Sequence, residues 1–433
     1  MYLTAKQHIS RNTRGGEYIT ALRALCYHAA RMYNVGLYSV RQHFFNTGEY
    51  LSYYDNYHLC KSNENYALLL TDTGQQLLRL VERDMKSFFA LLKLKQDGKY
   101  SEDVHLPRYK DKTGMMTCAV QGRSVRIHDG KARIGVTKEL REMYNLPFRY
   151  MEFTIPKNVD QQTIKEVRIR PLFGGTEFDI EFIHRREVME PSEADGVLSI
   201  DPGVTNLLTC TVHSNGRPES FIMDGRYIKN VNCYYNKTVA RLRGIYDRDK
   251  KIEGTTKRMA RLSKGRKNRI NAYFDAVSKY IVEYCRSHGI GKVVIGYNKE
   301  IKQGTDMGAV SNQNFVYIPF HRLRSKLMGR CELYGIAYES QEESYTSKAC
   351  ALTLDRIPDY GDSNIPEFSG YREKRGVYKV KGSPVRVNAD VNGSINIYRK
   401  YLKCKSKDDL SSDDVRVLVN GPVLRINPLK GYS

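Results

Sequence analysis

Two aspartates stand where carboxylates that bind metal ions could meet. Asp201 follows the apolar run VLSI at the start of a D-P-G turn, and Asp390 opens the helix-like segment DVNGSINIYRKYL. Hydrolysis of a phosphodiester with two Mg²⁺ ions about 4 Å apart uses carboxylate oxygens from distant parts of a chain. Aspartate in a turn or at a helix start is usually structural. The two residues therefore become informative only through the elements that separate them.

Those elements predict an arrangement in which the aspartates can converge. Residues 197–212 read as a strand, a tight turn and a second strand, and a third strand follows Asn215-Gly216. The full order is βββ-α-β-α-β-α, the RNase H-like order, which brings strand ends and the last helix together. The later elements are a helical stretch at 226–287, a strand at 292–296, a helix near 319–334, a strand at 336–340 and a helix at 390–402.

The N-terminal half predicts a helical part followed by a small β domain. Residues 16–104 carry apolar side chains at helical spacing, and Thr73 with Gln76 has the spacing of a capping box. From 125 to 188 the pattern changes to short β runs, with Gly174-Gly175 as a hairpin signal. Four arginines on or near these strands are candidates for contact with RNA, or are simply solvated: Arg168, Arg170, Arg185 and Arg186.

The charge balance indicates a polyanionic partner. The 433 residues include 70 Lys plus Arg against 48 Asp plus Glu, a net charge of +22, and 41% of them are hydrophobic, as in globular chains. Nucleic acid is the first expectation, because it neutralises such an excess. The alternatives on charge alone are a ribosomal-type structural protein and a membrane-surface protein.

The cysteines and the apolar runs set further expectations. Nine cysteines are present without a C-x-x-C pair, so neither a zinc ribbon nor a disulfide framework is predicted. No stretch reaches 18 uncharged apolar residues and no secretion signal is evident, so we expect a cytoplasmic protein that does not bind membranes, nucleoid-associated if it is prokaryotic.

Six runs resemble, in their order along the chain, the conserved core of TnpB (OrfB) proteins of insertion sequences. TnpB proteins are similar in turn to type V CRISPR effector nucleases and to eukaryotic Fanzor proteins. The resemblance covers residues 197–400, and the N-terminal half matches more loosely through NVGLYSVRQHF and MKSFFALLK. The six runs are SIDPGVTNLLT, VVIGYNKEIKQG, NQNFVYIPFHRLRSKL, EESYTSKA, FSGYREKRGVYK and NADVNGSINI.

The resemblance implies a fold and a division into domains. The fold class is α/β with small β and helical domains. Residues 1–190 would form a wedge-like β domain (about 1–15 and 105–190) with a helical recognition insertion (about 16–104). Residues 191–433 would form an RNase H-like RuvC nuclease domain with a basic helical insertion at about 226–287 and a C-terminal tail.

The resemblance also implies site residues. Asp201 matches the first RuvC aspartate and Asp390 the aspartate of the third motif, but Gly296 stands where most TnpB proteins have the glutamate of the second. A subset of TnpB proteins and the Fanzors carry that glutamate three residues before a Thr-Ser pair, which here indicates Glu343. The alternatives are Glu342, which would point to the opposite strand face, Glu300, or no third carboxylate at all.

A second departure from the family concerns zinc. Many relatives carry a four-cysteine ribbon between the second and third motifs, but only Cys350 remains here, so no zinc is expected. The GYREKRGVYK run is expected to fold locally. It would place Arg372 or Arg375 near the scissile phosphate, unless it is an exposed basic loop.

A basic stretch lies within the predicted helical insertion. Residues 248–269 hold ten Lys or Arg and two acids, and the continuation of the helix is apolar on one face. Such runs are usually solvated, but in a chain of charge +22 we expect contact with an RNA–DNA heteroduplex. Each phosphate contact would steepen the salt dependence of binding by about 0.9 in log-log slope. The candidate contacts are Lys257, Arg258, Arg261, Lys264, Arg266, Lys267 and Arg269.

Three functions are open at this point. The first is a Mg²⁺-dependent (two ions, Mn²⁺ substituting) RNA-guided endonuclease that cuts double-stranded DNA, with a transposon-derived guide RNA supplying sequence specificity and the protein reading a short flanking motif. The second is a nuclease-dead, RNA-guided repressor, suggested by Gly296. The third is a carboxylate-triad transposase. The guide, the flanking motif, the heteroduplex length, the oligomeric state and the source organism are outside what the sequence specifies.

Overall fold

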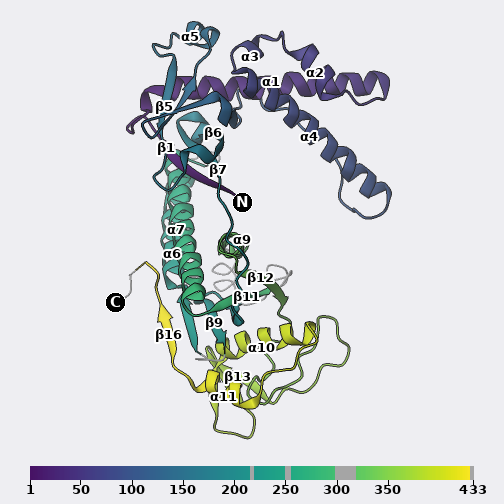
Figure 1. The fold of residues 1–433 in the computed structure, drawn as a ribbon, viewed down its shortest axis with the longest axis vertical. Coiled ribbons are helices and arrows are strands. Elements are labelled where there is room, and N and C mark those ends of the chain that lie inside the picture. Colours follow the sequence, from purple (N-terminus) through teal and green to yellow (C-terminus); the bar gives the residue numbers. More distant parts are fainter. Residues whose placement is uncertain (215–218, 249–254, 298–317, 430–433) are drawn as a thin grey trace. The chain divides into compact units, whose positions relative to one another are not determined.

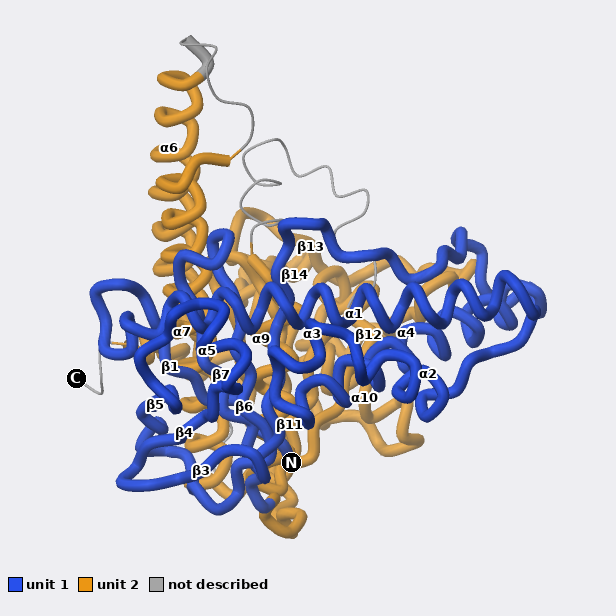
Figure 2. Tube along the Cα trace, turned by 90° about the horizontal axis from the view of Figure 1, so that it is seen from above, with its two compact units in different colours: residues 1–187 blue, residues 188–433 orange. Residues whose placement is uncertain are grey.

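The computed structural model describes residues 1–214, 219–248, 255–297 and 318–429. The chain divides into two compact units, unit 1 over residues 1–187 and unit 2 over residues 188–433 (Figure 2). Each unit has its own apolar core. In the described part of the chain, none of the helices combines the length and apolarity needed to cross a bilayer.

Unit 1 is built on an antiparallel sheet in the order β1-β7-β6-β2. The predicted hairpin joins β6 to β7 through Phe173, Gly174 and Gly175, all with positive φ. The φ of +78° at Gly175 lies in the left-handed region, which favours glycine. The strands are β1 (Tyr2–Ile9), β2 (Cys118–Gln121), β6 (Ile164–Leu172) and β7 (Glu177–Arg185).

The helices predicted between residues 16 and 104 are present, and a second sheet, β3-β4-β5, completes unit 1. The predicted capping box is wrong. Leu70 is the N-cap of α4, which places Thr73 inside the first turn, where its hydroxyl donates to the Ala119 carbonyl (3.0 Å). The elements are α1 (Ile19–Thr47), α2 (Tyr53–Cys60), α3 (Glu64–Ala67), α4 (Thr71–Gln96), β3 (Val125–His128), β4 (Lys131–Gly135), α5 (Lys138–Tyr144) and β5 (Tyr150–Thr154).

Unit 2 has a six-stranded sheet in the order β12-β11-β8-β9-β10-β16. β8, β9 and β10 form the predicted antiparallel meander, while β11 and β12 run parallel to β8. The predicted order of elements is therefore confirmed. The edge strand β16 was expected only as a tail, and it pairs in parallel with β10. The strands are β8 (Gly196–Pro202), β9 (Asn206–His213), β10 (Ser220–Asp224), β11 (Ile290–Tyr297), β12 (Ala337–Glu342) and β16 (Val423–Ile426).

Helices lie on both faces of this sheet. Leu198 and Ile200 of β8 pack in the same core as α7 and α9, whereas Val197 packs with Ile397 and Tyr401 of α10. The alternation of side chains along a strand therefore directs residues 197, 199 and 201 towards α10. The long helices α6 and α7 run side by side (Figure 1). The helices are α6 (Arg226–Arg248), α7 (Lys257–Ser287), α9 (Phe320–Leu333), α10 (Ala389–Cys404) and α11 (Ser412–Asn420).

The segment between β12 and α10 folds locally around a carboxylate. Asp355 accepts hydrogen bonds from the backbone amides of Cys350 and Ser369 (both 2.9 Å) and from the Ser369 hydroxyl (2.5 Å). Cys350 is buried in an apolar cluster with Tyr378. The predicted local fold of GYREKRGVYK is a hairpin in the small sheet of β13 (Gly370–Lys374), β14 (Val377–Val380) and β15 (Arg386–Asn388).

Candidate active site

Asp201 lies on the face of β8 that α10 covers. Its carboxylate packs against Gly393, since a Cβ on this glycine would lie 2.7 Å from Asp201 Oδ2. Gly393 follows Asp390 by three residues, which places both on the same side of the helix. A glycine inside α10 therefore allows the carboxylate of β8 to approach the helix that carries the second aspartate.

Glu343 follows directly after β12 and brings its carboxylate to Gly296 of the neighbouring strand β11. A Cβ on Gly296 would lie 2.7 Å from Glu343 Oε2 and 2.7 Å from Ile397 Cδ1. Val294 packs with α10, so Gly296, two residues later, lies on the same face of the sheet as Asp201. The carboxylate of Glu343 thus occupies the space that a side chain at position 296 would need.

A turn follows Glu343. β12 ends at Glu342, and Thr346 and Ser347 lie in a turn. The Thr346 amide and hydroxyl donate to the Glu343 carbonyl, at 3.2 and 2.8 Å. This turn carries the chain from the strand end towards α10.

Glu342 and Glu300 were the alternatives to Glu343, and of these two the structure describes only Glu342. Glu342 forms an ion pair with Lys400 of α10, and its carboxylate also accepts from the Ser344 amide (2.5 Å). These contacts and the Lys400 charge hold the pKa of Glu342 below its ordinary value despite burial. Glu300 lies outside the described residues. The charge of Glu343 raises the pKa of Asp201.

Asp390 stands in the first turn of α10 but is not its cap. Asn388 is the N-cap and accepts from the amides of Asp390 (3.0 Å) and Val391 (3.2 Å). The Asp390 carboxylate is held instead by Asn206 Nδ2 (2.6 Å) and Arg372 Nη2 (3.0 Å). Its side chain is therefore turned towards the start of β9 and towards β13.

The charges of Glu343 and Asp390 act on the buried carboxylate of Asp201. Loss of hydration raises the pKa of Asp201 well above its ordinary value, and the charges of Glu343 and Asp390 raise it further, while Arg372 lowers it. Burial raises the pKa of Glu343 to about 7, with Glu342 adding to the shift and Arg324 opposing it. No donor among the described residues forms a hydrogen bond with the carboxylate of Asp201 or Glu343.

This set of donors suits a hard divalent cation. All three are carboxylates, the ligands that Mg²⁺ prefers, and a cation would relieve the repulsion that raises the pKa of Asp201. Within the described ranges no three His, Cys, Asp or Glu side chains are close enough to hold one ion. Asp390 would have to exchange its bonds with Arg372 and Asn206 to join Asp201 and Glu343.

The two arginines predicted near the scissile phosphate lie beside this site. Arg372 forms an ion pair with Asp390, and its side chain is half exposed. Arg375 donates to the Thr205 hydroxyl in the turn that follows Asp201. Both come from the β13–β14 hairpin, so this hairpin brings cationic groups to the carboxylates.

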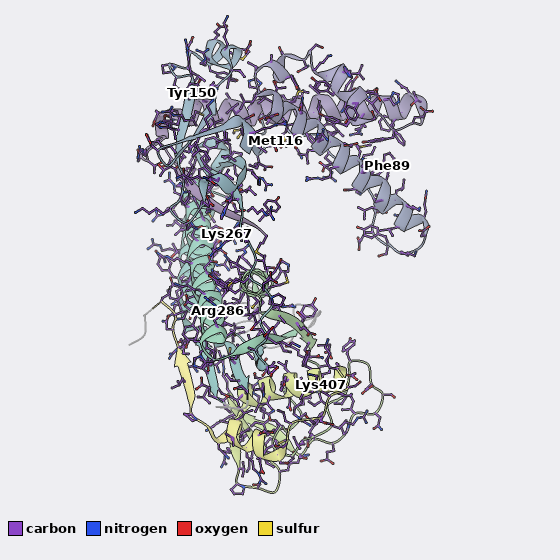
Figure 3. The ribbon with its side chains drawn as sticks, in the orientation of Figure 1. Phe89, Met116, Tyr150, Lys267, Arg286 and Lys407 are labelled. Atoms are coloured by element: carbon purple, nitrogen blue, oxygen red, sulfur yellow. The ribbon has the colours of Figure 1, made fainter. Side chains whose placement is uncertain are left out.

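The predicted basic contacts lie on the N-terminal part of α7, where Lys267 is labelled in Figure 3. Arg258, Arg261, Arg266 and Arg269 line a groove of about 270 Å³ with tyrosines of α6. Arg266 lies over the Tyr235 ring at 5.0 Å and donates to Asn232. Five of the seven cations are exposed and form no ion pair with any carboxylate in the described part of the chain: Lys257, Arg258, Arg261, Lys267 and Arg269.

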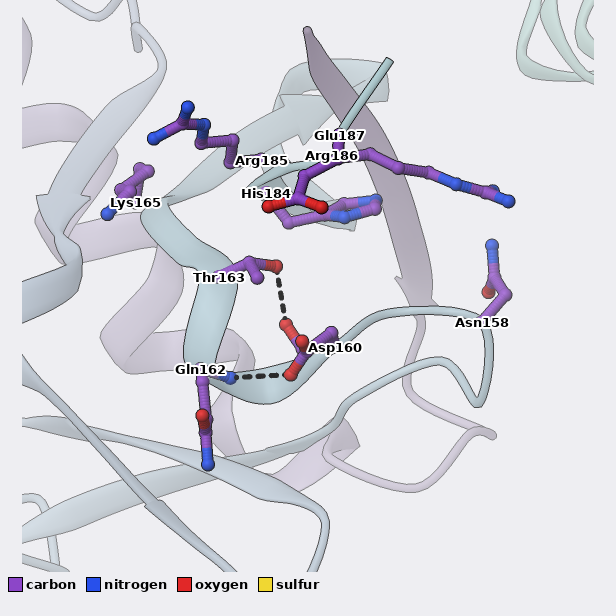
Figure 4. Close-up of a pocket in the computed structure, with 9 residues that line it drawn as sticks. All are labelled: Asn158, Asp160, Gln162, Thr163, Lys165, His184, Arg185, Arg186 and Glu187. Atoms are coloured by element: carbon purple, nitrogen blue, oxygen red, sulfur yellow. Dashed lines mark hydrogen bonds between the residues drawn. The ribbon is translucent and has the colours of Figure 1, made fainter. Parts of the chain in front are cut away.

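The arginines of unit 1 separate into two groups. Arg168 pairs with Glu166, and Arg170 pairs with Asp179 (2.7 Å) and Glu181 (2.7 Å), so these two are neutralised within the sheet. The remaining two line a pocket of about 630 Å³ with Lys165, and Figure 4 shows them extending to opposite sides of His184. They are Arg185 and Arg186.

Comparisons with known proteins show which proteins the chain is similar to. The family model OrfB_IS605, described as a probable transposase, matches residues 181–302, and the Cas12f1-like TNB domain matches residues 320–397. The TnpB-like protein ORF457 of Acidianus two-tailed virus is 22% identical over 431 residues, which cover 93% of this chain and 88% of the relative. The chain is a TnpB-type protein. It is related to type V effectors.

A solved structure shares the fold of this TnpB-type chain. The Cas12f1–sgRNA–target DNA complex, determined by cryo-EM, matches with a TM-score of 0.53 and 16% identity, over 88% of this chain and 82% of that chain. The mixed α/β architecture of the TnpB-type chain is therefore shared with that protein.

Several residues that contact the TnpB-type site were assigned no role from the sequence. Gly393 had a signal, since an isolated glycine inside a helical pattern usually has a packing reason. Asn206 lies in a matched motif but its amide reads as a turn residue. Arg425, which donates to Asn206 Oδ1 (2.7 Å), sits on the unpredicted strand β16. Lys400 had no signal, because lysine in a helix is normally exposed.

Gly296→Ala should weaken divalent-ion binding by the TnpB-type protein. The new methyl group would displace the Glu343 carboxylate or Ile397. We expect the Mn²⁺ dissociation constant to rise about tenfold or more, by analogy with the loss of a group that orients a ligand. Gly244→Ala is the matched control, since a Cβ there meets nothing within 4 Å. Equal Mn²⁺ affinities for the two variants would contradict the placement of Glu343.

The raised pKa of Glu343 predicts opposite effects of pH on stability and on metal binding. Because the folded pKa is about 7 against an ordinary 4.5, the metal-free protein loses stability as pH rises through this window. Mn²⁺ affinity should rise over the same window, since the ionised carboxylate binds the ion. Glu343→Gln should therefore raise the metal-free Tm by a few degrees at pH 8.

The same variant should show little effect on Tm at pH 4.5, where Glu343 is protonated in the folded protein and carries no charge to remove. Added Mn²⁺ should raise the Tm of the parent protein more than that of Glu343→Gln at pH 8. A variant less stable than the parent at pH 8 without metal would show that Glu343 stabilises the fold and is not a strained ligand. Thermal unfolding followed by circular dichroism measures both.

Proposed function

We propose that the chain is an RNA-guided DNA endonuclease encoded by an insertion-sequence transposon. It would use a transposon-derived guide RNA, read a short flanking DNA motif and cut double-stranded DNA by phosphodiester hydrolysis with two Mg²⁺ ions. Unit 2 would be the RuvC nuclease domain with α6 and α7 as its basic insertion. Unit 1 would be the wedge-like domain with its recognition helices.

One observation carries the catalytic part of this proposal. The Glu343 carboxylate lies in the space beside Gly296, on the face of the sheet that also carries Asp201, and both Glu343 and Asp390 raise the pKa of Asp201. A chain that had lost its nuclease activity would have no need to keep two further carboxylates whose charges act against the buried Asp201. Such repulsion lowers stability, and pKa values perturbed by a charged neighbour are common at functional sites.

The residues of the chain have distinct parts in this chemistry. When bound, Mg²⁺ would supply the positive charge that neutralises the phosphate and favours an attacking water. Asp201, Glu343 and Asp390 would hold it, after Asp390 had exchanged its bonds with Asn206 and Arg372. Arg372, released from Asp390, would be available for a non-bridging phosphate oxygen.

Support for the nucleic-acid partners comes from charge and from the relatives. The solved relative is a complex with a guide RNA and a target DNA. Five exposed cations of α7 pair with no carboxylate in the described part of the chain. Together with the arginine–tyrosine groove beside α6 they suit a phosphate backbone, which we infer to be that of the RNA–DNA heteroduplex. Arg185 and Arg186 suit contact with RNA on unit 1.

A second function is favoured by one contact. The ion pair of Arg372 with Asp390 keeps the third carboxylate away from the other two, as a nuclease-dead, RNA-guided repressor would allow. Guided binding without cutting in Mg²⁺ or Mn²⁺ would identify that function. The transposase alternative predicts joining of DNA ends without a guide.

The purified protein–RNA complex, obtained by expression with the native flanking DNA, should cut a matched target in Mg²⁺. Cutting should fall by at least about a thousandfold in Asp201→Ala, Glu343→Ala and Asp390→Ala, while binding of target DNA is retained, because the ligands serve the transition state. Glu339→Ala is the matched control, since Glu339 pairs with Lys405 and Lys292 and lies outside the site. Absence of a discrete RNA in the purified complex would remove the guided function.

Removing the cations of α7 should flatten the salt dependence of target binding. Lys267→Gln with Arg269→Gln should reduce the log-log slope by about 0.9 for each phosphate that these side chains neutralise in the parent complex, measured by filter binding across a salt series. Lys279→Gln on the same helix is the control, because Lys279 pairs with Glu283 (3.5 Å). An unchanged slope in the double variant would place the heteroduplex elsewhere.

A further inference from the structure

A buried lysine holds the chain on both sides of Glu343. Lys400, in the second half of α10, is 1% exposed. Its ammonium pairs with the carboxylate of Glu342 and donates to the Ser344 carbonyl (3.2 Å), the residues immediately before and after Glu343. It also donates to the Pro358 carbonyl (3.1 Å) and lies 3.6 Å from Asp359 Oδ1.

Two buried asparagines extend this contact along the helix. Asn396 Nδ2 donates to the carbonyls of Thr346 (2.9 Å) and Ala349 (2.7 Å). Asn392 Nδ2 donates to the Ala349 carbonyl, and its Oδ1 accepts from the Ala351 amide, both at 2.8 Å. Residues 392, 396 and 400 follow one another at intervals of four, so they form one polar stripe on α10.

The cost of burying a charge restricts where Glu342 and Ser344 can lie. An ammonium taken out of water is stable only when its partners are in place, and an unpaired buried charge costs several kcal/mol. Lys400 can therefore keep its charge buried only while Glu342 and Ser344 stay where they are. Glu343 has no hydrogen-bond donor of its own among the described residues, so its direction depends on these neighbours.

We propose that Lys400 is a positioning residue that fixes the Glu343 carboxylate for divalent-ion binding, with Asn396 and Asn392 holding the turn that follows. This rests on the proposed function, in which Glu343 is a metal ligand. α10 then sets two ligands at once, Asp390 from its first turn and Glu343 through the stripe. A glutamate displaced to the end of an edge strand needs such an anchor because the strand no longer fixes it.

Mn²⁺ binding to the protein–RNA complex tests this directly. Free Mn²⁺ would be measured by electron paramagnetic resonance, with the Glu343→Ala complex giving the background from RNA and from other sites. Lys400→Met should raise the dissociation constant of the Glu343-dependent ion about tenfold or more, as loss of a group that orients a ligand does. Lys403→Met is the matched control, because Lys403 lies on the same helix, is half exposed and pairs with Asp359.

Cutting provides a second readout. In Lys400→Met the Mg²⁺ concentration for half-maximal cutting should rise about tenfold, while the rate at saturating Mg²⁺ falls much less. A purely structural role would lower the melting temperature and leave the Mg²⁺ requirement unchanged, which would overturn the inference. Asn396→Ala should shift the Mg²⁺ requirement in the same direction as Lys400→Met.

A double variant separates a loss of folding from a loss of positioning. Glu342→Gln with Lys400→Met leaves no uncompensated charge, so it should melt closer to the parent than Lys400→Met does. Its Mn²⁺ affinity should remain weakened, because the hydrogen bond to Ser344 is still missing. Parental Mn²⁺ affinity in this folded variant would overturn the inference. If the parent itself shows no Glu343-dependent ion, the proposed function fails instead.

Discussion

The close packing of α10 on the central strands of unit 2 is the contact on which the site depends. Gly393 and Gly296 each lack a side chain where a carboxylate from another element must pass. The space left at Gly393 admits Asp201 to the helix, and the space at Gly296 admits Glu343 to the sheet. Interiors packed at crystal-like density leave no other room for these groups. Each glycine is therefore as much a part of the carboxylate arrangement as the acids themselves.

Charge balance then decides how the carboxylates are held. Burial raises the pKa values of Asp201 and Glu343, with the charges of Glu343 and Asp390 adding to the shift of Asp201 and the charge of Glu342 adding to that of Glu343. Asp390 is held by Arg372 and Asn206, and the contacts with Lys400 hold the pKa of Glu342 below its ordinary value despite burial. The site thus contains two carboxylates with compensating partners and two without. The uncompensated pair is the one that a divalent cation would stabilise most.

Much of this arrangement could be predicted from sequence. Short apolar runs predicted β8 to β12, and the resemblance to TnpB proteins pointed to Asp201, Asp390 and Glu343. What could not be predicted depends on contacts between distant segments. Three contacts join separate segments of the chain. They are the pairing of β16 with β10, the ion pair of Arg372 with Asp390 and the ion pair of the buried Lys400 with Glu342. The capping box at Thr73 failed for a similar reason, because its hydroxyl bonds to Ala119 of β2.

The proposed displacement of the RuvC glutamate from β11 to the end of β12 would have a mechanical consequence. A side chain within a central strand is fixed by hydrogen bonds on both edges of that strand. β12 is an edge strand, and Glu343 lies just beyond its last residue, so the sheet restrains it on one side only. The polar stripe of α10 supplies the missing restraint from the other side. If the relocation is real, this chain would combine two changes that accompany it, a glycine at position 296 and the buried Lys400 on the helix that faces it.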